Sequence, residues 1–177
     1  MKKITTLLLL AGIALNVFAL LTACATGGKV SKTDGLTLQN AIEQSAVKTS
    51  AELPGGSRVA VVAFESPNGD LSEFIMEEFN GALHDLGILV VDRKNLAYVF
   101  QELNFQISGN VSEETARSIG KFLGADIVIT GQLTSFGDSY RYRTNAINVE
   151  TAARVSITRF DVRDDPELRR MTAGAKQ

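Results

Sequence analysis

The pattern of hydrophobic and polar positions along the chain predicts helices that alternate with strands. Apolar residues recur at helical spacing over residues 36–51 and 70–86, and again in two segments between Asp92 and Gly124. Three shorter runs are apolar on both faces and rich in β-branched residues, which is typical of buried strands: Arg58–Phe64, Ile88–Val91 and Asp126–Leu133. This alternation predicts strands that are separated by helical connections.

Residues suited to helix ends occur at the expected places. The carboxylate of Asp70 can cap the helix at 70–86, and Glu73 can reach back to it from three positions later. Ser112 can cap the last of the helices before Gly124, and Gly124 can end that helix. We therefore expect helix boundaries close to these residues.

Two later segments, Ser139–Glu150 and Ala153–Phe160, alternate between outward and inward positions in the manner of half-exposed strands. In the second segment Val155, Ile157 and Arg159 are expected to share one face. Short turns join these segments to each other and to the strand before them, so antiparallel hairpins are expected.

The predicted order of elements is α-β-α-β-α-α-β-β-β. Helical crossovers between the early strands imply parallel pairing, and the final hairpins imply an antiparallel meander. We therefore expect an α/β domain of the α+β type, with a single mixed sheet and helices packed on it. Asp161–Gln177 is charged and is predicted to be a frayed tail in which a helix could start at Pro166.

The first residues have the pattern of an export signal. Lys2 and Lys3 precede an almost wholly apolar stretch, Leu7–Leu21, which is too short for a confident membrane span and fits a secretory signal. The sequence Leu21-Thr22-Ala23-Cys24 then resembles the lipobox of bacterial lipoproteins. That resemblance implies cleavage before Cys24 and lipid attachment to it. The alternative is a plain signal or anchor helix in which the cysteine is incidental.

Cleavage would leave 154 residues with a formal charge of −4, because residues 1–23 contain two lysines and no acidic residue. Residues 24–35 are small and polar, as in a flexible tether, residues 36–160 form the predicted domain, and residues 161–177 form the tail. Ala25 follows the cysteine, and by analogy with lipoprotein sorting this residue favours the outer membrane, with the domain facing the periplasm.

Composition excludes several kinds of chemistry. The single cysteine and the single histidine, His84, exclude a disulfide framework and the two-histidine metal motifs. The sequence contains no phosphate-binding loop, dinucleotide fingerprint or nucleophile elbow. We therefore expect no enzyme activity, cofactor or metal. Tyr140–Arg143 interleaves aromatic and basic residues, which could bind nucleic acid or an anionic sugar polymer. A strand with tyrosines inward and arginines outward is the favoured interpretation, and no nucleic acid partner is expected.

The segment VVDRKNLAYVFQELNFQISGNVSEETARSIGKFLGADIVITGQL, together with the strand VAVVAFES, resembles the CsgG/HfaB family. These are lipoproteins of curli-type and holdfast-type assembly and secretion, and the same fold family includes LpoB-type activators of penicillin-binding proteins. The residues that carry the resemblance are mainly expected to cap helices, form turns or allow close packing: Asp92, Arg93, Gly109, Gly120, Gly124, Asp126 and Gly131.

The resemblance implies a lipid-anchored envelope protein that binds envelope partners in assembly or secretion. The alternative is activation of a penicillin-binding protein, which is a peptidoglycan synthase. A third hypothesis is a homo-oligomer that forms a pore. Two membrane hairpins would need about 40 additional residues, and the strands at 139–160 carry several arginines, so a tethered binding module is favoured over a pore.

Overall fold

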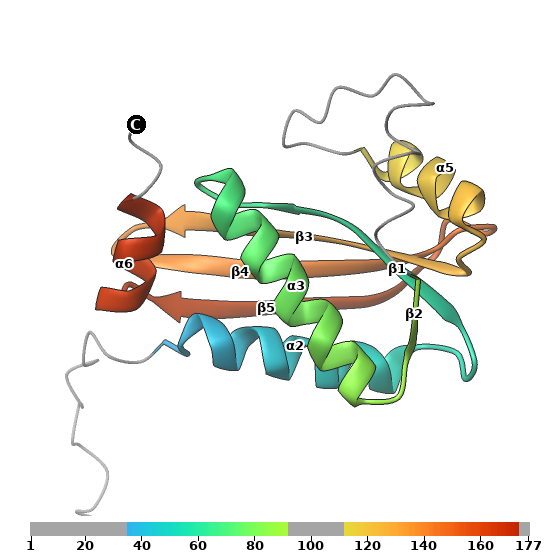
Figure 1. Cartoon of the computed structure of the whole chain (residues 1–177), viewed down its shortest axis with the longest axis horizontal. Coiled ribbons are helices and arrows are strands. Elements are labelled where there is room, and N and C mark those ends of the chain that lie inside the picture. Colours follow the sequence, from blue (N-terminus) through green and yellow to red (C-terminus); the bar gives the residue numbers. More distant parts are fainter. Residues whose placement is uncertain (1–34, 92–111, 174–177) are drawn as a thin grey trace, which may run out of the picture. The chain divides into compact units, whose positions relative to one another are not determined.

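The computed structural model describes residues 35–91 and 112–173, and Figure 1 shows their arrangement. The elements in chain order are α2 (Leu38–Glu52), β1 (Arg58–Glu65), α3 (Gly69–Asp85), β2 (Leu89–Val90), α5 (Glu113–Leu123), β3 (Ile127–Phe136), β4 (Ser139–Asn148), β5 (Arg154–Arg163) and α6 (Pro166–Ala173). The helix predicted directly after Asp92 lies outside the described residues. Among those residues, no helix combines the length and the apolar character needed to cross a bilayer.

The five described strands form one sheet in the order β2-β1-β3-β4-β5. β1 pairs in parallel with β2 and β3, whereas β3, β4 and β5 pair antiparallel through two hairpins. Parallel neighbours need a crossover, which the helical connections supply, and short turns suffice for the hairpins. The prediction of a single mixed sheet, parallel early and antiparallel late, is therefore confirmed.

Strand β1 is buried on both faces of the sheet. Helices α2 and α3 lie on one face of the sheet (Figure 1), and the large core beneath them contains Ile42 and Phe79. Helix α5 belongs to a smaller cluster on the other face, where Ile119 packs with Val128. The run Val59–Val62 alternates between the two clusters, which explains why this run is apolar at every position.

Strand β2 differs from the predicted buried strand at Ile88–Val91. It is only two residues long and lies at the edge of the sheet, and its Leu89 side chain is 59% exposed. An apolar run at a sheet edge has a strand neighbour on one side only, so the continuous pattern that predicts burial on both faces is misleading here.

Helix α3 begins one residue earlier than predicted and has a different cap. The Oδ1 atom of Asn68, rather than the Asp70 carboxylate, accepts a hydrogen bond from the Leu71 N–H at 2.8 Å. Asp70 instead lies in the first turn, where its negative charge favours the positive end of the helix. Ser112 caps α5 as predicted, accepting from the Thr115 N–H at 3.1 Å.

The tail predicted from Asp161 is in part a continuation of the sheet. β5 extends to Arg163 because the alternation of inward and outward residues persists, and Val162 is fully buried opposite Tyr140. The boundary between domain and tail at residue 160 is therefore too early.

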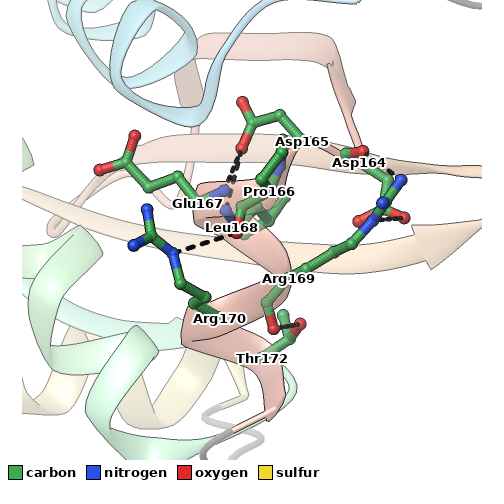
Figure 2. A network of polar contacts seen from close by, with 8 residues as sticks. All are labelled: Asp164, Asp165, Pro166, Glu167, Leu168, Arg169, Arg170 and Thr172. Carbon is green, nitrogen blue, oxygen red and sulfur yellow. Dashed lines mark hydrogen bonds and ion pairs between the residues drawn. The ribbon is translucent and has the colours of Figure 1, made fainter.

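Helix α6 follows at the end of the sheet and starts at Pro166, the position that the sequence allowed (Figure 1). Its Leu168 side chain is buried, with 1% exposure. Figure 2 shows the polar contacts at its start, where the Asp165 carboxylate accepts from the Leu168 N–H at 2.9 Å. Arg169 pairs with Asp164 at 2.8 Å between Nε and Oδ2. A capped helix with a buried anchor replaces the predicted fraying.

Candidate functional site

The face of the sheet opposite α2 and α3 is uncovered by any described helix along the middle of β3, β4 and β5. Tyr142 and Ala146 of β4 lie in the large core, so the residues between them point to the opposite face. We call this surface the open face, and its members are Thr130, Gln132, Thr134 and Phe136 of β3, Arg141, Arg143 and Asn145 of β4, and Ile157, Arg159 and Asp161 of β5. Helix α5 reaches only one end of it, near Val128.

At one corner of the open face, two contacts fix the side chain of Arg141. The Nε atom of Arg141 lies 3.0 Å from Oδ1 of Asp161, its direct partner on β5. The guanidinium carbon also lies 3.8 Å above the centre of the Phe136 ring. An ion pair and a cation–π contact together hold this side chain in one orientation, although each alone contributes little at a surface.

The next cross-strand pair contains two arginines. Arg143 and Arg159 are direct partners in the register of β4 and β5, and both belong to the open face. Neither forms an ion pair within the described part of the chain, and the buried Nε of Arg143 has no hydrogen-bond partner there. Like charges directly opposite each other in a sheet are destabilising. Within the described residues, these two positive charges therefore repel each other without a carboxylate to compensate them.

The opposite side of the same strands is buried and closely packed. The hydroxyls of Ser45, Thr144 and Thr158 are buried and lie 2.6–3.0 Å from one another, which joins α2 to β4 and β5. Tyr142 stacks on Phe64 with ring centres 5.7 Å apart. Fixed inward side chains hold the backbone of β4, so Arg143 is presented from a rigid strand.

Burial also affects the phenol group of Tyr142. Desolvation raises its pKa far above the usual range, and the nearby Ser45 hydroxyl opposes this effect only weakly. The Tyr142 hydroxyl has no hydrogen-bond partner of good geometry among the described residues. This group is consequently neutral and acts in packing rather than in proton transfer.

Tyr140–Arg143 adopts the alternation that was favoured from sequence. Tyr142 lies in the core and Tyr140 packs against it, while Arg141 and Arg143 point to the open face. The expectation for the next strand was wrong, because Val155 packs against the large core whereas Ile157 lies on the open face and is 43% exposed. The register shifts between Ala146 and the residue after it, which makes Val155 an extra, bulged residue.

Three glycines of the segment that resembles the CsgG/HfaB family occupy positions where a side chain would clash with a neighbour or strain the backbone. A Cβ atom at Gly120 would lie 2.3 Å from Val128 Cγ1, and one at Gly131 would lie 2.0 Å from Phe64 Cε1. Gly124 ends α5 with a φ of 63°, a left-handed conformation that favours glycine. These glycines allow α5 and Phe64 to approach the sheet closely.

Asp126 joins the start of β3 to β1. Its Oδ2 atom accepts from the Arg58 N–H at 2.8 Å, and its own N–H donates to the Arg58 carbonyl at 2.8 Å. The other predicted site residues lie outside the described residues: Cys24, Asp92, Arg93 and Gly109.

No candidate metal site is found in the part of the chain that the structure describes. No group of three or more His, Cys, Asp or Glu side chains could hold a metal ion there. The His84 side chain is 81% exposed near the end of α3, and its Nδ1 atom lies 3.8 Å from Oδ1 of Asp85. Sequence reasoning did not single out Arg159, because its pairing with Arg143 depends on the hairpin register and on the bulge at Val155.

The chain matches the family described as curli production assembly/transport component CsgG over residues 58–156. Its fold is similar to the LpoB C-terminal domain from Salmonella enterica, with a TM-score of 0.62 and 16% identity over 72% of this chain and 98% of that chain. The LpoB C-terminal domain from Escherichia coli gives a TM-score of 0.60 and 19% identity, covering 71% and 97%. No curated protein matches the chain.

Proposed function

Because the chain belongs to the family of the curli production assembly/transport component CsgG, we propose that it is a non-enzymatic envelope protein that binds other envelope proteins. Its role is the assembly or secretion of surface structures. The observation that carries this proposal is the open face, which presents charged and apolar side chains from a rigid sheet. Such a surface suits the binding of a macromolecule. Among the described residues, no group of three or more His, Cys, Asp or Glu side chains could hold a metal ion.

The attachment to the envelope is proposed from the sequence Leu21–Cys24. Cleavage before Cys24 and lipidation of this residue would anchor the chain by several fatty acyl chains. A single chain holds a protein only marginally, whereas two or more give stable attachment. With Ala25 after the cysteine, we place the protein at the outer membrane, facing the periplasm.

The anchor predicts a specific labelling result. Radiolabelled palmitate should enter the wild-type chain in growing cells and should be absent from the Cys24→Ala variant. Cys24 is the only cysteine in the sequence, so no other thiol can carry the label. Immunoprecipitation followed by autoradiography measures it, and equal labelling of the two chains would contradict the anchor.

Activation of a penicillin-binding protein is the alternative function. The fold likeness to LpoB C-terminal domains, which are covered almost completely by this chain, favours it over a pore. This chain has only about ten residues between Cys24 and the folded part, so it would reach less far from the membrane than a protein with a long tether.

Capture from membranes distinguishes the two functions. The tagged full chain is cross-linked in intact cells, purified under denaturing conditions, and its adducts are identified by mass spectrometry. Fibre subunits or secretion components would support the assembly function, and a penicillin-binding protein would support the alternative. A ladder made of this chain alone would support the oligomer instead. Absence of any envelope adduct would contradict the proposed function.

A further inference from the structure

We propose that Arg143 and Arg159 bind the carboxylates of an acidic segment on the partner protein. This inference rests on the proposed binding function and names the chemistry of its partner. It assigns the middle of the open face as the contact, at the place where β4 and β5 put two guanidinium groups side by side.

The first argument is electrostatic. Directly opposed residues in antiparallel strands have Cβ atoms about 4.5–5.5 Å apart, so two arginines in these positions repel each other. The adjacent pair shows how the same sheet satisfies an arginine, because Arg141 has Asp161 as its partner at 3.0 Å. Arg143 and Arg159 have no such carboxylate within the described residues. A carboxylate from outside would remove the repulsion.

The second argument is the state of the Arg143 side chain. Its Nε–H is buried and makes no hydrogen bond within the described residues. A buried donor without an acceptor costs free energy, and a guanidinium presents its donors in a planar fork that matches a carboxylate. Because Nε is buried, a partner carboxylate would bind Arg143 through the two terminal nitrogens of the guanidinium, while it also neutralises Arg159.

The surroundings of the pair favour a protein over a polyanion. Ile157, two residues before Arg159, and Phe136, beneath Arg141, are exposed on the same face at 43% and 55% and offer apolar contacts. A protein segment can place apolar side chains against Ile157 and Phe136, which a phosphate or sulfate polymer cannot do, and a surface that combines arginine with aromatic side chains is typical of protein interfaces.

A stability measurement separates a binding role from a structural role. The Arg159→Glu substitution turns the opposed arginines into an ion pair, so thermal unfolding of the purified full chain should shift upward by about 1–4 °C at low salt. The shift should shrink in 1 M salt, where charges are screened. The Lys48→Glu substitution on the exposed side of α2 provides a control that leaves the open face unchanged. A downward shift for Arg159→Glu would show that the arginines serve the fold, and would overturn the inference.

Zero-length cross-linking tests the contact itself. A carbodiimide couples carboxylates directly to amines, so the Arg143→Lys or Arg159→Lys chain in membranes should gain a link from that position to an Asp or Glu of another protein. The double variant Arg143→Glu/Arg159→Glu should lose at least nine-tenths of that partner, while Lys48→Glu should keep it.

Four further outcomes would overturn the inference. Equal capture of the partner by the double variant would show that the two arginines do not contribute to binding, and would leave the proposed function intact. The proposal that the arginines bind an acidic segment of another protein would be contradicted by links confined to a second copy of the chain. It would also be contradicted if the double variant lost a bound polysaccharide rather than a protein. If the wild-type chain captures no envelope protein at all, the proposed function fails as well.

Discussion

At the scale of a single residue, Gly131 leaves the space that the Phe64 ring occupies. The Phe64 ring lies so close to Gly131 that a Cβ atom there would overlap it, and the same ring stacks on Tyr142. The sequence identifies Gly131 as a position of close approach. It does not identify Phe64 as the neighbour, because that contact depends on the pairing of β1 with β3, which are far apart in the chain.

The buried Tyr142 hydroxyl leads to a prediction about alkaline pH. Burial raises the pKa of Tyr142, so the folded state keeps the phenol protonated while the unfolded chain ionises near pH 10. The unfolded state then binds fewer protons than the folded state, and stability falls as pH rises above about 10, by about 1.4 kcal/mol per pH unit for this group.

The Tyr142→Phe variant should lose this part of the pH dependence. Near neutral pH its free energy of unfolding should stay within about 1 kcal/mol of wild type, because the removed hydroxyl makes no well-formed hydrogen bond within the described residues. Urea unfolding at pH 7 and pH 11 measures both effects, with Tyr140→Phe as the matched control at a less buried position. An unchanged slope in Tyr142→Phe would contradict this account.

At the scale of elements, the helices and the central strands could be predicted more accurately than the edges. β1 and the first residues of β3 are apolar on both faces because both clusters use them, and sequence alone reveals that pattern. β2 and the end of β5 could not be predicted as well. Burial at an edge depends on which elements cover it, and local periodicity does not contain that information.

Helix α6 is an element whose contribution can be measured. Leu168 is buried in the large core, so Leu168→Ala should lower the free energy of unfolding by about 2–5 kcal/mol. Glu167→Ala, at the exposed neighbouring position, should change it by less than about 0.5 kcal/mol. Chemical denaturation of the two variants provides the comparison, and equal stability would mean that the C-terminal helix is dispensable for the core.

At the scale of the whole folded part, charge is divided between the two sides of the sheet. Helices α2 and α3 carry seven acidic residues and one lysine, whereas β4 and β5 carry five arginines and one aspartate. The sequence predicted outward arginines on β4, but the pairing of Arg143 with Arg159 required the observed register. The candidate site was therefore predictable in its residue types and not in its geometry.

The central claim is that the open face of the sheet contacts another envelope protein. A photo-reactive amino acid at Thr134, on the open face, is compared with one at Gln44, on the exposed side of α2, in the membrane-bound full chain. Irradiation of intact cells should give an adduct with another protein from Thr134 and none of comparable yield from Gln44. Adducts from Gln44 alone would contradict the assignment of this face.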